Sequence, residues 1–323
     1  MLYERFTKSG TLSEPKGVPE PQWALKSTIY WMKSLQILCE HEQVTFAAAR
    51  ADFGKLQRIA MCSQRENTIF EQLLLSLHHL SALEALISVE HPVDVARTAI
   101  ITWYYGIYCA ASAMIAAQDG SQQQKHGPTA VTWDRQIVCP NNIRGPFGFR
   151  VSTLVEAEYL TQIRELESGV KFALVRRPVT IEDARGAACA YLAGTAKWYS
   201  TQIGLRVKQT KAFEDLAVAD FRSKAAKDLR DRQLAGKPVG FLHQAIRYRG
   251  KANYREALYL SYGPNAKSDI GSFIPDMAFV LAAFLSIAAA LSAARLGTSL
   301  WTSFIVDLDL KRSFSRTPHG LFT

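Results

Sequence analysis

The sequence predicts an all-α fold, a multi-helix bundle built from long helices. Apolar residues recur at intervals of three and four through most of the chain, and capping patterns, Gly and Pro mark where these runs begin and end. At 323 residues, with 48% hydrophobic and 21% charged residues, the chain has the composition of a folded globular protein. This length suits either one large domain or two packed helical parts.

Residues 1–21 are expected to form an irregular arm, because they combine mixed charge with several Gly and Pro residues. Two long helices are predicted next, over 23–51 and 66–88, where Leu and aromatic residues keep a helical spacing. A third helix begins at Pro92, which suits a first helical turn, and ends at the stop signal before Gly120.

The segment 120–152 is rich in Gly, Pro, Asn and Gln, which predicts a long loop. Its β-compatible stretches at 130–133 and 136–138 favour a small β-hairpin within this loop. Thr153 and Thr180 each open a capping-box pattern with an acid three residues later, so we expect a helix to start at each of them.

Three further helices are predicted over 213–234, 239–262 and 272–296, separated by segments that contain Gly and Pro. Residues 277–294, within the last of them, form a run of eighteen residues without a formal charge, which just reaches the length of a membrane span. Eight of the eighteen are Ala, and the larger side chains follow the spacing of a helix packed on other helices. We therefore expect a helix buried in protein, with a membrane span as the alternative.

The predicted elements divide the chain into four parts: an irregular arm over 1–21, a helical part with a long loop over 22–152, a second helical part over 153–311 and a C-terminal tail over 312–323. The five cysteines are scattered and never spaced as C-x-x-C, which favours reduced thiols and a cytoplasmic location. The N-terminus lacks the apolar core of a signal peptide, so export is not expected.

The sequence lacks the common motifs that identify catalytic, nucleotide-binding and metal-binding sites. It contains no glycine-rich phosphate loop, no dinucleotide-binding fingerprint, no nucleophile elbow and no zinc-binding helix. We expect neither a cofactor nor a metal. The candidate functional residues lie in a tyrosine-rich stretch, near the C-terminus and in a basic segment.

In the tyrosine-rich stretch, residues 96–127, one side of the predicted helix carries an arginine and three phenols, Arg97, Tyr104, Tyr105 and Tyr108. This stretch resembles the HEPN family, whose helical bundles often carry an Arg, a Tyr-Tyr pair, small residues along the same helix and a His after the next loop. The matching positions are Arg97, Tyr104, Tyr105, Ala110, Ala111 and His126. The resemblance implies a helical bundle that dimerises. Many members are metal-independent ribonucleases of defence or toxin–antitoxin systems, and others are inactive partners.

The ribonuclease signature of that family is an Arg followed, after four to six residues, by a His. The pair with this spacing here is Arg312 and His319, although Ser313 stands where the family often has a polar amide or acid. An Arg fork can orient a phosphodiester, and a His can move a proton near neutral pH. The candidate catalytic residues are therefore Arg97, His126, Arg312 and His319.

Positive charge is concentrated between Arg206 and Glu256, a segment with thirteen Lys or Arg against six Asp or Glu, a surplus of seven within a total net charge of +9. We call these residues the basic segment and expect them to form the dominant positive surface. Arginine forks suit phosphates, and tyrosine rings suit the bases of single-stranded nucleic acid. The candidate nucleic-acid contacts are Arg247, Arg249, Lys251, Arg255, Tyr248 and Tyr254. The alternative is a helix whose arginines pair with acids and whose tyrosines pack inward.

The sequence therefore predicts a HEPN-like protein of a bacterial defence or toxin–antitoxin type system. It would bind RNA and, with a histidine as acid or base, cleave it without metal. The alternative is a non-catalytic scaffold or regulatory subunit that forms a homo-oligomer and binds nucleic acid or an acidic protein partner encoded nearby. We do not expect a membrane partner, although a membrane-associated effector that uses residues 277–294 is a third hypothesis.

Overall fold

The computed structural model describes residues 21–141, 143–169, 171–174, 176–253, 270–311 and 319–322. The irregular N-terminal segment predicted over 1–21 lies outside these residues except for Pro21, which begins the first described helix. Most of the predicted C-terminal tail lies outside them as well.

The described residues confirm the all-α fold. They form α2 (Pro21–His41), α3 (Phe46–Asp52), α4 (Ser63–Ile87), α5 (Pro92–Asp119), α6 (His126–Trp133), the π-helix η1 (Asp134–Val138), the 3-10 helix η2 (Gly145–Gly148), α7 (Glu156–Glu167), α8 (Ile181–Lys208), α9 (Lys211–Glu214), α10 (Lys224–Leu234), α11 (Phe241–Asn253), α14 (Phe273–Leu296), α15 (Thr298–Lys311) and α16 (His319–Phe322). Within the described ranges the only β pairing is an isolated bridge between Val151 and Val239. The five cysteines are free thiols, as predicted.

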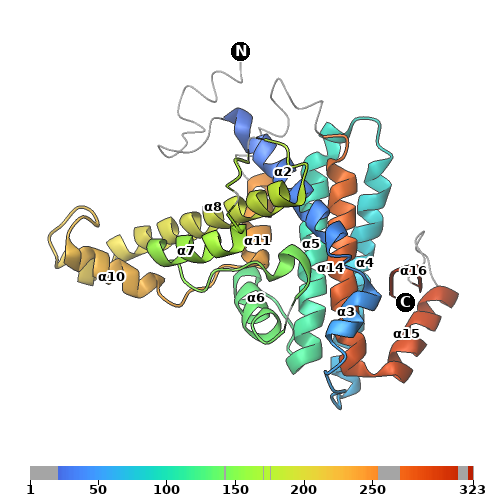
Figure 1. The fold of residues 1–323 in the computed structure, drawn as a ribbon. Helices are drawn as coiled ribbons and strands as arrows, with labels where there is room; N and C mark the ends of the chain where they lie inside the picture. Colours follow the sequence, from blue (N-terminus) through green and yellow to red (C-terminus); the bar gives the residue numbers. More distant parts are fainter. Residues whose placement is uncertain are drawn as a thin grey trace.

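An upright bundle of α2, α4, α5 and α14 forms the main body of the protein (Figure 1). Both α5 and α14 are long and apolar enough to cross a membrane, but 78% and 94% of their most apolar windows are buried by other parts of the chain. The stretch 277–294 thus lies in a helix surrounded by protein. Gly106 allows the close packing of these two helices, because a Cβ atom there would lie 2.5 Å from Leu281 Cδ2.

A second helical part projects sideways from this bundle and consists of α7, α8, α9 and α10 (Figure 1). We call residues 151–239 the arm and the other described residues the body. The arm has a hydrophobic core of its own, which includes Tyr159, Leu192, Phe213 and Leu234. The first turns of α8 pack on α2 of the body, so the arm is anchored at its base.

The predicted helical part 153–311 includes both the arm and helices of the body. The arm begins at Val151, next to the predicted boundary at 152. The chain returns to the body at Gly240, and both α11 and α14 pack on α5. Hydrophobic periodicity shows which face of a helix is buried but not which helix covers it, so periodicity does not assign α11 and α14 to one part of the fold.

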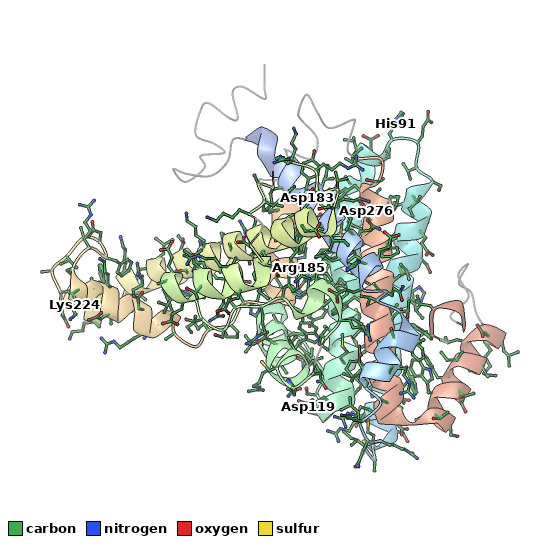
Figure 2. The ribbon with its side chains drawn as sticks, in the orientation of Figure 1. His91, Asp119, Asp183, Arg185, Lys224 and Asp276 are labelled. Atoms are coloured by element: carbon green, nitrogen blue, oxygen red, sulfur yellow. The ribbon has the colours of Figure 1, made fainter. Side chains whose placement is uncertain are left out.

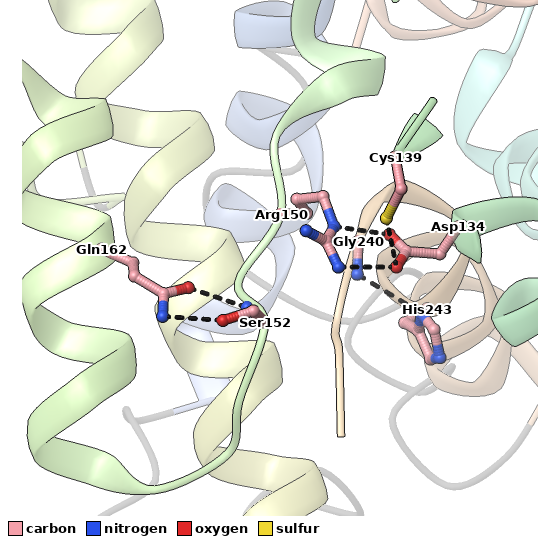
Figure 3. A network of polar contacts seen from close by, with 7 residues as sticks. All are labelled: Asp134, Cys139, Arg150, Ser152, Gln162, Gly240 and His243. Carbon is pink, nitrogen blue, oxygen red and sulfur yellow. Dashed lines mark hydrogen bonds and ion pairs between the residues drawn. The ribbon is translucent and has the colours of Figure 1, made fainter. Parts of the chain in front are cut away.

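Two chain segments that lie side by side connect the arm to the body. We call this connection, which includes Val151 and Val239, the neck. Val151 and Val239 exchange both backbone hydrogen bonds, with N···O distances of 2.9 and 3.0 Å. Next to this bridge, the Gly240 amide donates a 3.3 Å hydrogen bond to Nδ1 of His243, whose ring is buried (Figure 3).

Burial lowers the pKa of His243 from 6.5 to about 4, opposed by the nearby Asp134 carboxylate. Between these values the unfolded chain binds more protons, so the free energy of unfolding should fall as pH is lowered from about 6.5 to about 4. The full contribution, about 3 kcal/mol, is present above this window. Urea unfolding across the window should show the loss. His243→Asn, which keeps an acceptor for the Gly240 amide, should unfold with a weaker pH dependence; an equal dependence would contradict the assignment.

Two predicted helices are interrupted. The helix expected over 23–51 is divided into α2 and α3 by a turn with Gln43 at a positive φ of 48°, after which Thr45 caps α3 through the Ala48 amide. The helix expected over 213–234 is likewise divided into α9 and α10.

The β-hairpin predicted within 120–152 is wrong. The stretch 130–133 lies in α6, and 136–138 lies in η1. Ala130, Trp133 and Ile137 are buried at helical spacing in the core of the body, and the Trp133 ring packs 5.7 Å from the Phe284 ring of α14. Burial of this face overrides the β preference of the individual residues.

The two predicted capping boxes have different outcomes. Thr180 caps α8, accepting from the Asp183 amide while the Asp183 side chain accepts from the Thr180 amide. Thr153 instead accepts from the Val155 amide in the connection before α7, which begins at Glu156. The same local pattern therefore forms a cap in one place and a turn in the other.

Candidate functional site

The tyrosines of α5 lie beside the first residue of α6. Tyr104 is buried, whereas Tyr105 and Tyr108 are half-buried. The His126 ring lies edge-on to all three, with ring centroids 5.4, 5.9 and 4.7 Å away in the same order. His126 Nδ1 is 2.8 Å from the Tyr104 hydroxyl oxygen. The sequence brings these groups close through one helix and the short connection after it.

A fifth side chain reaches this group from α11. Arg249 Nη1 lies 3.3 Å from His126 Nε2 and 3.4 Å from the Tyr105 hydroxyl oxygen. The guanidinium carbon is 4.8 Å from the Tyr104 ring centroid and 6.0 Å from that of Tyr105. We call Tyr104, Tyr105, Tyr108, His126 and Arg249 the His126 site.

The contacts define the protonation of the site. Because an arginine only donates, His126 Nε2 accepts from Arg249, and the Nδ1 proton is donated to the Tyr104 hydroxyl oxygen. Burial and then the charge of Arg249 lower the pKa of His126, so its imidazole is neutral at neutral pH. Burial raises the pKa of Tyr104, partly opposed by Arg249, so this phenol also stays neutral.

The site is electropositive, and one of its hydrogen-bond donors has no partner among the described residues. Arg249 Nε is buried and makes no hydrogen bond to any part of the chain that the structure describes. The N-terminus of α6, which His126 begins, has no side-chain cap, and the helix dipole favours a negative charge there. A guanidinium, an imidazole and a helix N-terminus together suit an anionic ligand.

Arg97, the other candidate residue of α5, contacts α11. Its exposed side chain donates a 2.9 Å hydrogen bond from Nε to the Ala252 carbonyl oxygen near the end of α11. This bond ties α11 to α5 one turn beyond Arg249. The residues of the HEPN resemblance therefore lie along α5 and at the start of α6, but Arg97 holds a neighbouring helix and is not among the contacts of His126.

The other predicted bases of α11 face the arm. Arg247 donates a 3.2 Å hydrogen bond to the Thr195 hydroxyl of α8, and its guanidinium carbon lies 5.5 Å from the Tyr191 ring centroid. Lys251 Nζ lies 5.8 Å from the same ring. Arg247 and Lys251 are half-buried and lie on a different side of α11 from Arg249.

The basic segment is consequently not one continuous surface. Its α11 bases are half-buried near the body, whereas Lys224 lies at the far end of the arm (Figure 2). Within the basic segment, the exposed bases that lie on the arm are Arg206, Lys211, Arg222, Lys224, Lys227, Arg232 and Lys237.

Comparison with protein-family models, with curated proteins and with solved structures found no match to this chain. The assignment of the site therefore depends on its geometry.

Tyr248 is a correction to the predicted nucleic-acid contacts. Its ring is fully buried between Trp31 and Trp103, and its hydroxyl donates a 3.0 Å hydrogen bond to the Thr28 carbonyl oxygen. It packs inward, as the alternative reading of this helix expected, so its ring offers no face to a base.

Several predicted residues are not tested. Arg312, Tyr254 and Arg255 lie outside the described residues, and His319 begins the short helix α16 without a described side chain. Among the described residues, no three His, Cys, Asp or Glu side chains gather so that they could hold a metal ion.

The structure joins two residues that sequence reasoning had assigned to separate sites, His126 and Arg249. They are 123 positions apart in the sequence. No local pattern connects them, because the whole arm lies between α6 and α11 in the sequence.

Proposed function

We propose that this chain is a HEPN-like protein of a bacterial defence or toxin–antitoxin type system that binds RNA at the His126 site. The observation that supports it is the Arg249 guanidinium, which lies over the tyrosine rings of α5 and against the neutral imidazole of His126. Phosphate is recognised by such a planar fork, and aromatic rings accept unstacked bases.

Arg249 can exchange its present partners for a phosphate. Its contacts to His126 and Tyr105 are 3.3 and 3.4 Å, longer than the usual range for a charged donor. A phosphodiester would accept shorter, charge-assisted hydrogen bonds from the same nitrogen and from the unused Nε. Withdrawal of the guanidinium toward the phosphate would then leave His126 Nε2 free.

A free Nε2 on a neutral His126 is a general base. It takes the proton of a ribose 2′-hydroxyl, whose oxygen attacks the adjacent phosphorus while the bond from phosphorus to the 5′-oxygen breaks. The leaving oxygen takes a proton from the Tyr105 hydroxyl or from water, and the proton held by His126 afterwards returns to that donor. The products are a 2′,3′-cyclic phosphate and a 5′-hydroxyl end, and no heavy atom from outside the RNA enters them. Tyr104 keeps the imidazole oriented through its contact with Nδ1.

We expect a fluorescently labelled single-stranded RNA to bind this protein with an affinity that falls steeply as salt is raised, because bound phosphates release counterions. Arg249→Gln should weaken binding by about 10-fold or more, since it removes a charged donor at the site. Fluorescence anisotropy at several salt concentrations measures both effects.

The matched control is Arg58→Gln, which removes an exposed arginine beside Gly297, the residue that follows α14. This variant should bind RNA nearly as the wild type does. Equal losses in both variants would indicate non-specific attraction to a basic protein, and absence of RNA binding by the wild type would overturn the proposal.

A further inference from the structure

A buried ion pair lies at the neck between arm and body. Asp134, at the junction of α6 and η1, is only 2% exposed, and Arg150 donates two hydrogen bonds of 2.9 Å to its carboxylate (Figure 3). Loss of one partner from such a pair leaves a buried charge without compensation. The pair therefore holds the end of α6 against the segment that leads into the arm.

The same carboxylate also touches the segment that returns from the arm. A Cβ atom on Gly240 would lie 3.0 Å from Asp134 Oδ1, so any other residue would require the carboxylate to shift by a few tenths of an ångström. Gly240 follows Val239, which forms the bridge to Val151. Asp134 is thus in contact with both chain segments of the neck.

The two helices that carry His126 and Arg249 both start or end at this point. His126 and Asp134 are eight positions apart, and Gly240 and Arg249 are nine positions apart. At the rise of an α-helix each spans about 12–14 Å. Helical segments of similar length, in α6 and α11, therefore run from the neck to the site and pack on one another.

We propose that the Asp134–Arg150 pair is a positioning device that sets the distance between His126 and Arg249 and so makes the His126 site responsive to the placement of the arm. Arg150 immediately precedes the first residue of the arm. A displacement of the arm at the neck acts on Arg150 and Gly240, while α8 separately packs on α2. Because helices bend little, such a displacement would move the other ends of α6 and α11 relative to one another. The consequence of this positioning for RNA rests on the proposed function, but the contact between His126 and Arg249 can be measured without RNA.

The test compares the titration of His126 by NMR in Arg150→Met and in the wild type, with the resonance assigned from a His126→Ala spectrum. The groups that face His126 are the three tyrosines of the site and Arg249. If the neck pair holds Arg249 against His126, its removal should shift the pKa of His126 upward, because the guanidinium and the burial that lower it both recede.

The control removes a comparable ion pair elsewhere on the body. Arg144 pairs with Asp52, away from the neck, and Arg144→Met should leave the His126 titration unchanged even if the protein loses stability. Arg150→Lys keeps the charge at the neck and should restore part of the wild-type titration.

A folded Arg150→Met protein with the wild-type titration of His126 would overturn the inference. If circular dichroism shows that this variant does not fold, Gly240→Ala provides the same test, because it displaces the Asp134 carboxylate while both charges remain. A shifted titration in a protein that binds no RNA would refute the proposed function and leave the positioning role intact.

Discussion

His126→Ala is expected to slow metal-free cleavage of RNA by about 100- to 10,000-fold, the usual contribution of a general base. Cleavage of a labelled single-stranded RNA in the presence of a chelator should yield 2′,3′-cyclic phosphate ends. Because the pKa of His126 lies below its ordinary value, the rate should rise with pH below neutrality and level off as the imidazole becomes fully neutral. RNA binding should survive in this variant, since Arg249 remains.

Two further variants separate the roles of the candidate histidines. Tyr104→Phe removes the oxygen that contacts His126 Nδ1 and should lower the rate less than His126→Ala does. His319→Ala tests the pair with Arg312 at the C-terminus. If His319→Ala abolishes cleavage and His126→Ala does not, the chemistry belongs to the C-terminal pair. Tight RNA binding without cleavage would instead support the non-catalytic scaffold or regulatory subunit.

Trp31→Ala is expected to reduce the free energy of unfolding by about 3–5 kcal/mol, the range found for buried large aromatic residues. Trp31 is fully buried on α2 and stacks on Tyr191 of the arm at a centroid distance of 4.3 Å. It also meets Trp103 edge-on and packs against Tyr248. Removing the indole would leave a cavity where α2, α5, α8 and α11 meet, and urea unfolding followed by circular dichroism measures the loss.

Trp198 supplies the matched control, because its side chain is 42% exposed and contacts Tyr199 at the surface of α8. Trp198→Ala should cost much less than Trp31→Ala. Trp31→Phe keeps an aromatic ring and removes a buried indole N–H that has no partner among the described residues, so its cost should lie between the two. Equal losses at Trp31 and Trp198 would contradict the packing described here.

The Trp31 cluster also bears on the proposed function. Tyr191 stacks on Trp31 on one side, and Arg247 and Lys251 of α11 lie over its ring. Two of the four bases that the sequence predicts to contact nucleic acid therefore help to hold the base of the arm against the body. We expect charge reversal at these two positions to loosen that junction, whereas reversal at Arg249 acts at the His126 site.

Local signals predicted the elements that depend on neighbouring residues. The third predicted helix agrees with α5, which begins at Pro92 and ends at Gly120 in a left-handed conformation with φ of 76°. The box at Thr180 caps α8 as predicted. Such features are encoded within a few positions, because a cap or stop residue bonds to a backbone group in the adjacent turn.

The predicted hairpin is wrong because the strand preference of its residues is weak and the packing of the helix overrides it. Val131, Thr132 and Trp133 suit a strand by residue type, yet in this protein Ala130 and Trp133 turn one face of α6 toward the body. The cap predicted at Thr153 is absent for a related reason. The Thr153 hydroxyl accepts from the Val155 amide, and α7 begins only at Glu156, so Thr153 lies before the first turn of the helix.

By itself, the sequence determined an all-α chain, its long core helices and the tyrosine stripe of α5 with His126 close behind, because helix periodicity and capping act within a few residues. Only the tertiary structure decided that residues 151–239 form a projecting arm, that Tyr248 packs inward and that Arg249 meets His126. These contacts join apolar and polar faces of helices far apart in the sequence. Which faces meet is settled by the packing of the whole chain, since each helix alone could bury its face against several partners.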